Sequence, residues 1–263
     1  MNYIDIILLG LIQGFTEFFP VSSSGHLIIG KILLGISSND TLIDVVLHLG
    51  TLFSILFFWR KDLLIDSKNI INGRIELLIK LFIACIPVAL IVYFFKDSIE
   101  NYFFIQNSIP FYLIINYAIM SFFIFISKYF HDNNKNSISY NHAFLVGVIQ
   151  CFALMPGISR SGITIVAGLL LGYTFRHSMK FSFYLAIPTI LFGAIFKIPE
   201  YKDAILNDIY FFYILLTGFI CSFIFGCFVL TFLDRIIKEH KYWIFSIYCL
   251  IISIFLLVYY YGY

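Results

Sequence analysis

The sequence predicts an all-α polytopic membrane protein, and three observations lead to this prediction. Of the 263 residues, 61% are hydrophobic and only 12% are charged, whereas soluble domains are about 45–50% apolar and about 25% charged. The mean hydropathy is +0.94, so lipid must solvate much of the surface. Apolar runs long enough to cross the about 30 Å core of a bilayer cover roughly residues 43–59, 75–95, 109–127, 179–198, 209–233 and 243–262.

The charges of the loops indicate how these six spans are oriented. The net charge is +2, which is too small to indicate a nucleic-acid partner. Basic residues gather in alternate loops, as in 60–74 after the first span and 176–180 before the fourth. If the basic loops lie in the cytoplasm, all six spans agree, and both chain ends are expected outside.

Two further apolar regions, 3–36 and 141–173, are interrupted in the middle by Pro, Ser and Gly. As a helix, the second piece of the first region would span only about 15 Å. The topology also requires each region to return to the side on which it began. We therefore expect two re-entrant helix pairs, because broken backbone at membrane depth must be buried or line a polar cavity.

The two interrupted regions are related in sequence. A shift of 137 residues without gaps aligns Gly10, Gln13, Ser22, Ser24, Gly25 and Gly35 with Gly147, Gln150, Ser159, Ser161, Gly162 and Gly172. The chain is therefore predicted to be a single membrane domain, 1–263, built from two repeats, about 1–130 and 138–263. Each repeat is a re-entrant helix pair plus three transmembrane helices, and because three is odd, the repeats have inverted topology.

The turns of the two pairs carry charges at a depth where charge is costly. We call residues 13–26 tip one and residues 156–164 tip two. Tip one contains Glu17 and His26, and tip two contains Arg160; ionisable residues inside a membrane indicate a functional site. The alternative is a Glu17–Arg160 ion pair in a structural scaffold, but such a pair alone would not need the hydroxyls beside it.

The hydroxyls of the tips predict an anion site, for which phosphate fits best. A helix follows each tip, so its free N–H groups and positive dipole end point at the tip. Arg160 can hold phosphate oxygens bidentately. The candidate phosphate-binding residues are Ser22, Ser24, Ser159, Arg160, Ser161 and Thr164.

Tip one also offers acid–base and metal chemistry. Glu17 can hold a cation that bridges to phosphate, or it can act as a base. His26 titrates near neutrality and is an acid/base or a nucleophile, while Ser23 is either a nucleophile activated by His26 or a further phosphate donor. Gln13 lies one helical turn before Glu17 and either orients it or bonds a neighbouring helix. His48 is either a core histidine or a cavity residue.

The two tips resemble the motifs of a known family. Gln13-x-x-x-Glu17 followed by Pro20-Val-Ser-Ser-Ser-Gly-His26, and later Pro156-Gly-x-Ser-Arg-Ser-Gly-x-Thr164, are similar to those of the bacitracin-resistance family of undecaprenyl-diphosphate phosphatases. The likeness covers nearly the whole chain. Many members have Glu where this chain has Gln13, so its metal binding would be weaker if that carboxylate is a ligand. The resemblance maps the family's essential positions to Glu17, Ser23, His26, Ser159, Arg160 and Thr164.

The resemblance implies that the protein hydrolyses undecaprenyl diphosphate, a C55 isoprenyl lipid, to undecaprenyl phosphate and inorganic phosphate. This reaction would recycle the lipid carrier for peptidoglycan synthesis and confer bacitracin tolerance. The resemblance also implies Mg²⁺ or Ca²⁺ as cofactor and the cytoplasmic membrane of a bacterium as location. The oligomeric state stays open, with a homodimer among the options. The alternative function is a transporter or flippase of the isoprenyl phosphate, because inverted repeats with broken helices are typical of transporters.

Overall fold

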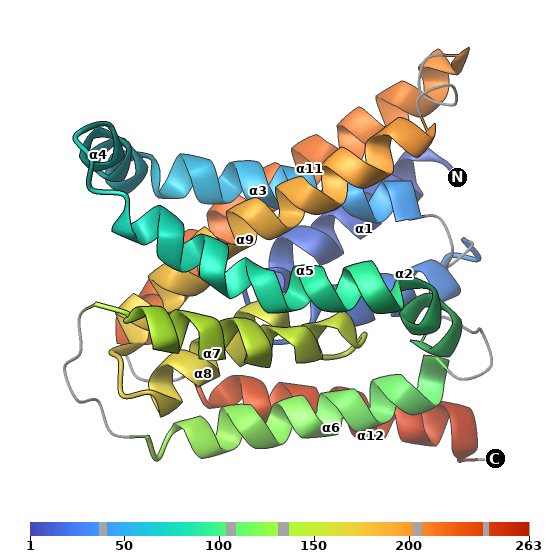
Figure 1. The fold of residues 1–263 in the computed structure, drawn as a ribbon. Coiled ribbons are helices and arrows are strands. Elements are labelled where there is room, and N and C mark those ends of the chain that lie inside the picture. The colour runs from blue at the N-terminus through green and yellow to red at the C-terminus, as the bar shows by residue number, and fades with distance from the viewer. Residues whose placement is uncertain (37–40, 104–108, 131–136, 202–206, 239–241, 263) are drawn as a thin grey trace.

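The computed structural model describes residues 1–36, 41–103, 109–130, 137–201, 207–238 and 242–262, and its regular elements in these ranges are all helices (Figure 1). Six of the described helices are long and apolar enough to cross a membrane. They coincide with the six predicted spans, which confirms the all-α polytopic fold. These helices are α3 (Thr41–Phe58), α5 (Glu76–Phe103), α6 (Ile109–Ser127), α9 (Phe175–Lys197), α11 (Ile209–Lys238) and α12 (Ile244–Tyr261).

Both interrupted regions fold as pairs of short helices. The first pair is α1 (Tyr3–Thr16) and α2 (Ser23–Leu33); the second is α7 (Tyr140–Gln150) and α8 (Arg160–Leu170), with the 3-10 turn η1 (Cys151–Leu154) between them. The 14 residues of α1 span only about 21 Å, too little to cross a bilayer core. The breaks therefore occur where the sequence placed the two tips.

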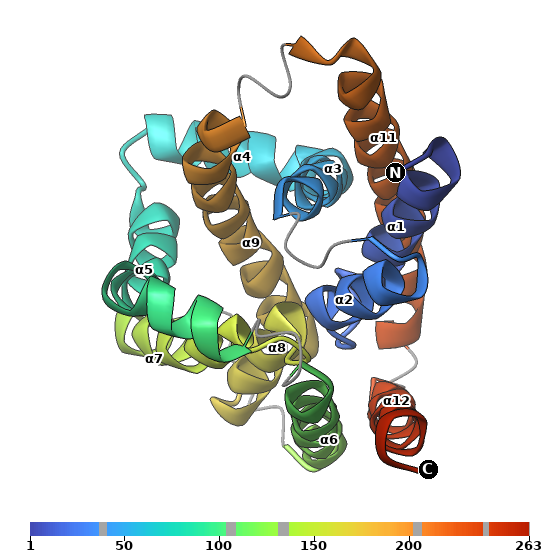
Figure 2. The same ribbon diagram turned by 90° about the vertical axis from the view of Figure 1, so that its right-hand side faces the viewer.

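The two halves of the chain are interleaved. Helix α1 lies along α11, and α7 lies along α5, so each short pair packs against a long helix from the other half (Figure 2). Helices α6 and α12 pack together, as do α3 and α9. This exchange brings the two tips into one interior.

One helix was not expected. Helix α4 (Arg60–Ile71) occupies a segment that the sequence analysis treated as a basic loop. It is held against α9, because Lys180 Nζ lies 2.9 Å from Asp62 Oδ1 and the Tyr184 hydroxyl donates to Asp66 Oδ2 over 3.0 Å. In Figure 1, α4 lies at the edge of the molecule opposite to both labelled chain ends. The basic segment and the two labelled chain ends thus lie at opposite edges of the molecule.

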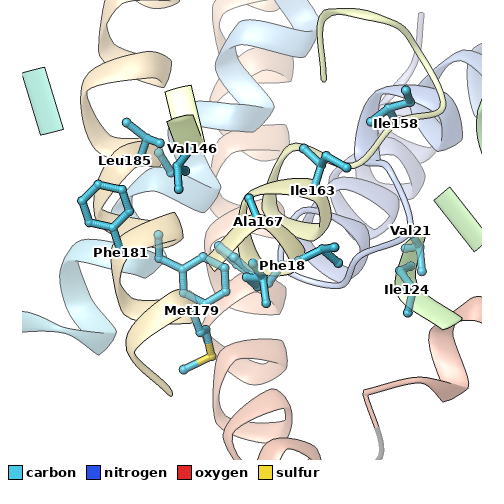
Figure 3. Packing of buried hydrophobic residues seen from close by; sticks show 14 of the residues in the cluster. Phe18, Val21, Ile124, Val146, Ile158, Ile163, Ala167, Met179, Phe181 and Leu185 are labelled. Carbon is cyan, nitrogen blue, oxygen red and sulfur yellow. The ribbon is translucent and has the colours of Figure 1, made fainter. Parts of the chain in front are cut away.

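Apolar side chains fix the tips in the core. Phe18 of tip one is 1% exposed and meets Phe183 of α9 edge-on, with ring centroids 5.4 Å apart. Figure 3 shows Phe18 close to Ala167 of α8, with Ile163 on the same short helix. The polar residues of the tips are therefore carried on a rigidly packed frame.

The close contact between α3 and α11 gives a stability test. A Cβ at Gly50 would overlap the carbonyl oxygen of Phe219 on α11, so we expect Gly50→Ala to destabilise the protein by about 1–3 kcal/mol. Gly193 is also helical but has nothing within 4 Å of an added Cβ. Gly193→Ala should leave stability unchanged or raise it by up to about 1 kcal/mol. Thermal unfolding in detergent measures both; equal melting temperatures for the two variants would contradict the packing.

Candidate active site

A buried carboxylate from tip one lies at the centre of the site. Glu17 is 6% exposed. Arg160 Nη2 donates to Glu17 Oε1 over 2.6 Å, which joins the two tips by an ion pair. Ser23 Oγ donates to Glu17 Oε2 over 2.6 Å, and Gln13 Nε2 donates to the same oxygen over 3.0 Å. The sequence-predicted residues Gln13, Glu17, Ser23 and Arg160 thus form one cluster.

The first long helix contributes a further residue to this cluster. His48 Nε2 lies 3.5 Å from Glu17 Oε2, while its Nδ1 lies 2.6 Å from the carbonyl oxygen of Asp44. Thr51 accepts from Gln13 Nε2 over 3.4 Å. The sequence left His48 open between the core and a cavity, and the structure places it beside the carboxylate. Its spacing of four from Asp44 was the available signal, but the helix face that meets tip one could not be read from it.

Two serines begin the helices that follow the tips. Ser22 caps α2 by accepting from Gly25 N over 3.3 Å, and Ser159 caps α8 by accepting from Gly162 N over 3.1 Å. These caps are equivalent positions in the 137-residue register. Ser22 has a left-handed φ of 63°, which costs a non-glycine residue roughly 1–2 kcal/mol. Backbone strain of this kind is often found at functional sites.

The remaining hydroxyls of the tips hold the backbone of the site together. Ser161 Oγ donates to the carbonyl oxygen of Glu17 over 3.0 Å, and its distance to Ser159 Oγ is 3.1 Å. Ser24 Oγ lies 3.2 Å from Ser22 Oγ. Thr164 Oγ1 lies 2.7 Å from Ser182 Oγ on α9 and also donates to the carbonyl oxygen of Arg160. Each predicted phosphate-binding residue therefore lies at the start of α2 or in the first turns of α8.

His26 is bonded to residues outside the carboxylate cluster. Its Nδ1 lies 2.8 Å from the Tyr117 hydroxyl of α6, and its Nε2 lies 2.7 Å from the Tyr248 hydroxyl of α12. Among the described contacts, it bonds neither Glu17 nor Ser23. Sequence reasoning missed both tyrosines, because Tyr and Phe are so frequent in this chain that no single one stood out.

Tip two is positioned by a side chain from α6. Asn116 is buried, and its Nδ2 donates to the carbonyl oxygen of Pro156 over 2.7 Å. The next residue, Gly157, has a φ of 97°, a conformation that glycine adopts without steric cost. The turn before Ser159 and Arg160 is therefore fixed at its first residues.

Several buried polar atoms of the site have no hydrogen-bond partner within the described part of the chain. These include Arg160 Nη1, Gln13 Oε1 and both amide atoms of Gln150. Leaving such atoms unpaired costs about 1–3 kcal/mol each. Arg160 can therefore pair with Glu17 through Nη2 and still offer Nη1 to an anion, whereas the acceptor Gln13 Oε1 is available to a cation or a donor.

Comparison with known proteins gives a consistent result over almost the entire chain. Residues 6–255 match the family model described as "Bacitracin resistance protein BacA". A protein of Bacteroides fragilis named undecaprenyl-diphosphatase is 36% identical over 98% of each chain. Proteins of the same name from Halothermothrix orenii and Campylobacter hominis are 36% and 37% identical, and cover 98% and 96% of this chain and 98% and 97% of their own. The chain belongs to the bacitracin resistance protein BacA family.

Proposed function

We propose that this protein is a membrane-embedded phosphatase that hydrolyses undecaprenyl diphosphate to undecaprenyl phosphate and inorganic phosphate. The names of its relatives support this substrate. The observation that carries the proposal is the buried Glu17–Arg160 pair, which leaves Arg160 Nη1 unpaired beside the start of α8. A purely structural pair would gain from pairing every nitrogen, whereas a phosphate site needs an open donor.

The residues of tip two would hold the diphosphate. The helix start of α8 supplies backbone N–H groups and a positive dipole end, a combination that binds phosphate. Arg160 Nη1 adds a charged donor. The Ser159 and Ser161 hydroxyls bond each other over 3.1 Å, and rotation about their C–O bonds can turn them to substrate oxygens. Ser22 and Ser24 form the corresponding hydroxyl pair at tip one, and Thr164 anchors the backbone beneath Arg160.

The donor set around Glu17 fits a divalent cation. It offers one carboxylate and the unpaired oxygen Gln13 Oε1, and Mg²⁺ is often held by one or two carboxylates together with substrate phosphates and water. We propose Mg²⁺ or Ca²⁺, held by Glu17 and Gln13. When bound, the cation would neutralise charge on the diphosphate. Within the described residues, three or more His, Cys, Asp or Glu do not gather into a metal cluster, so the substrate must complete the site.

Ser23 and His26 are the candidates for proton transfer and attack. Ser23 Oγ donates to Glu17 over 2.6 Å, so Glu17 can accept its proton if the hydroxyl attacks phosphorus. His26, held between two tyrosine hydroxyls, can give or take a proton in the first turn of α2. Most of the rate enhancement would come from positioning and charge stabilisation, as is usual in phosphoryl transfer.

We also propose that the two repeats have inverted topology in the cytoplasmic membrane of a bacterium, with both chain ends outside. Three features support this arrangement: the equivalent caps Ser22 and Ser159, the exchange of α1 and α7 between halves, and the position of α4 opposite the chain ends. The monophosphate product would return to peptidoglycan synthesis. Turnover of the diphosphate, which bacitracin sequesters, would confer tolerance to that antibiotic.

Phosphate release by purified protein in detergent tests the proposed activity. With undecaprenyl diphosphate and Mg²⁺, we expect release by the wild type, and a fall in kcat of about 100-fold or more for Arg160→Lys, because a lysine cannot serve Glu17 and phosphate together. Malachite-green measurement of phosphate gives the rates, and gel filtration checks folding. A flippase would give no release, because moving a lipid across a membrane breaks no phosphoanhydride bond, whereas hydrolysis continues in detergent.

Exchange of Gln13 for Glu tests the cation site. A second carboxylate beside Glu17 strengthens cation binding but repels Glu17 when no cation is present. We expect Gln13→Glu to melt at a lower temperature than the wild type in EDTA and to gain more from added Mg²⁺. Its Mg²⁺ half-saturation for phosphate release should fall about tenfold. If the variant and the wild type showed the same Mg²⁺ dependence of phosphate release, residue 13 would not be a cation ligand.

Comparing variants of Ser23 and Ser24, which are neighbours in tip one, shows whether Ser23 does more than donate a hydrogen bond to phosphate. Ser23 bonds Glu17, whereas Ser24 bonds only Ser22 among the described contacts. We expect kcat to fall about 100-fold or more in Ser23→Ala and less than tenfold in Ser24→Ala. Equal losses in the matched pair would assign Ser23 to phosphate binding alone.

A further inference from the structure

An apolar groove of about 570 Å³ lies between α5, α7 and η1. From α7 and η1 it is lined by Phe144, Val148 and Cys151, a spacing of four and three residues that forms one helix face. From α5 it is lined by Pro87 and Leu90. Its volume lies in the about 300–1,000 Å³ range of sites that bind small organic ligands.

The packing of α5 against α7 frames the groove. Helices α5 and α7 pack along each other, and a Cβ at Gly147 would overlap the backbone of Ala84. The two helices run in the same direction in Figure 1. Phe144 lies one turn before this contact, the other groove residues follow it in sequence, and α7 ends three residues beyond it. Pro87 adds to the opening, because a proline inside a helix removes a backbone hydrogen bond and kinks the helix.

The groove lies beside tip two, which carries the proposed phosphate-binding residues Ser159, Arg160 and Ser161. Its lining includes Leu154 and Met155, and Met155 precedes Arg160 by only five residues. Leu154 belongs to η1, which packs against α8, the helix that begins at Arg160. An elongated molecule with one end at Arg160 would therefore meet the groove where η1 packs against α8.

We propose that this groove binds the isoprenyl chain of the substrate, next to the diphosphate held at the tips. The proposal rests on the proposed function, which supplies an apolar chain joined to an anionic head. The isoprenyl chain is the occupant that fits, because the groove is almost free of polar atoms along its walls, yet its η1 wall packs against the helix that begins with Arg160. Phe152, which lines it, is 54% exposed, so the groove is open to lipid and the chain can enter sideways from the bilayer.

The groove acts by orientation more than by affinity. Lipid tails are as apolar as the groove, so moving the chain from bilayer to protein has little hydrophobic driving force. A chain held along α5 and α7 would instead fix the direction of the diphosphate, and misplacement of a reacting group by about 1 Å can cost roughly 100-fold in rate. Filling the groove should therefore impair long-chain substrates more than short ones.

Tryptophan substitutions in the groove test this prediction. Val148→Trp and Leu90→Trp would fill it, while Val258→Trp and Leu250→Trp on α12 are matched controls, since Val258 and Leu250 are also exposed, at 57% and 46%. We expect the groove variants to lower kcat/KM for undecaprenyl diphosphate about tenfold, with a change below twofold for geranyl diphosphate. The controls should change neither value. Equal effects on both substrates, or equal effects of groove and control variants, would overturn the proposal.

A labelling experiment on the wild-type protein works even if a variant does not fold. A geranylgeranyl diphosphate carrying a terminal benzophenone is irradiated with the protein, and adducts are located by mass spectrometry. We expect adducts within residues 87–91 and 144–155, reduced by excess undecaprenyl phosphate. Adducts confined to other helices would exclude the groove. A wild type that binds this probe in the groove but releases phosphate from neither substrate would reject the proposed function and retain the chain site.

Discussion

The ion pair between Glu17 and Arg160 is the constraint on which the arrangement of the site depends. Neither charge could remain at this depth alone, because an uncompensated charge in a low-dielectric interior is strongly destabilising. The pair joins residues 143 positions apart in sequence. Ser161 strengthens the junction by bonding the backbone of Glu17. The two tips are therefore one structural unit, although they come from opposite halves of the chain.

The hydrogen-bonding atoms that this unit leaves unpaired are available to a ligand. Arg160 uses one terminal nitrogen for Glu17, and Gln13 uses its amide nitrogen for the same carboxylate, which leaves Nη1 and Oε1 without described partners. Helix α8 begins at Arg160 itself, so backbone donors converge on the same place. A fully satisfied network would rigidify the core and do nothing else. This network is held rigid and remains unsaturated.

Sequence reasoning could reach the spans and the tips because each has a strong local signal. Apolar runs define the six long helices α3, α5, α6, α9, α11 and α12, and Pro20 and Pro156 mark the breaks. It could not place His26, since α2 turns this residue toward Tyr117 and Tyr248, and which helices pack beside α2 is decided only by the complete fold. His48 was ambiguous for the same reason. Helix α4 was missed because its stability depends on Asp62 and Asp66 meeting α9, a contact between segments more than 100 residues apart. The inverted relation of the repeats remains a prediction from residue register and span number.

The interleaved packing also has a consequence for how the protein is made. Helix α1 leaves the ribosome first, but its long neighbour α11 begins at residue 209, and Glu17 is synthesised well before Arg160. Until then the first helix pair has neither its packing surface nor its counter-charge. The short pair cannot span the bilayer by itself, so the nascent chain must keep a carboxylate at an aqueous or interfacial position, or protonated, until the second half arrives. Assembly of the site thus has to wait for the second half of the chain, and a truncated first half would be left with an acid that lacks its counter-charge.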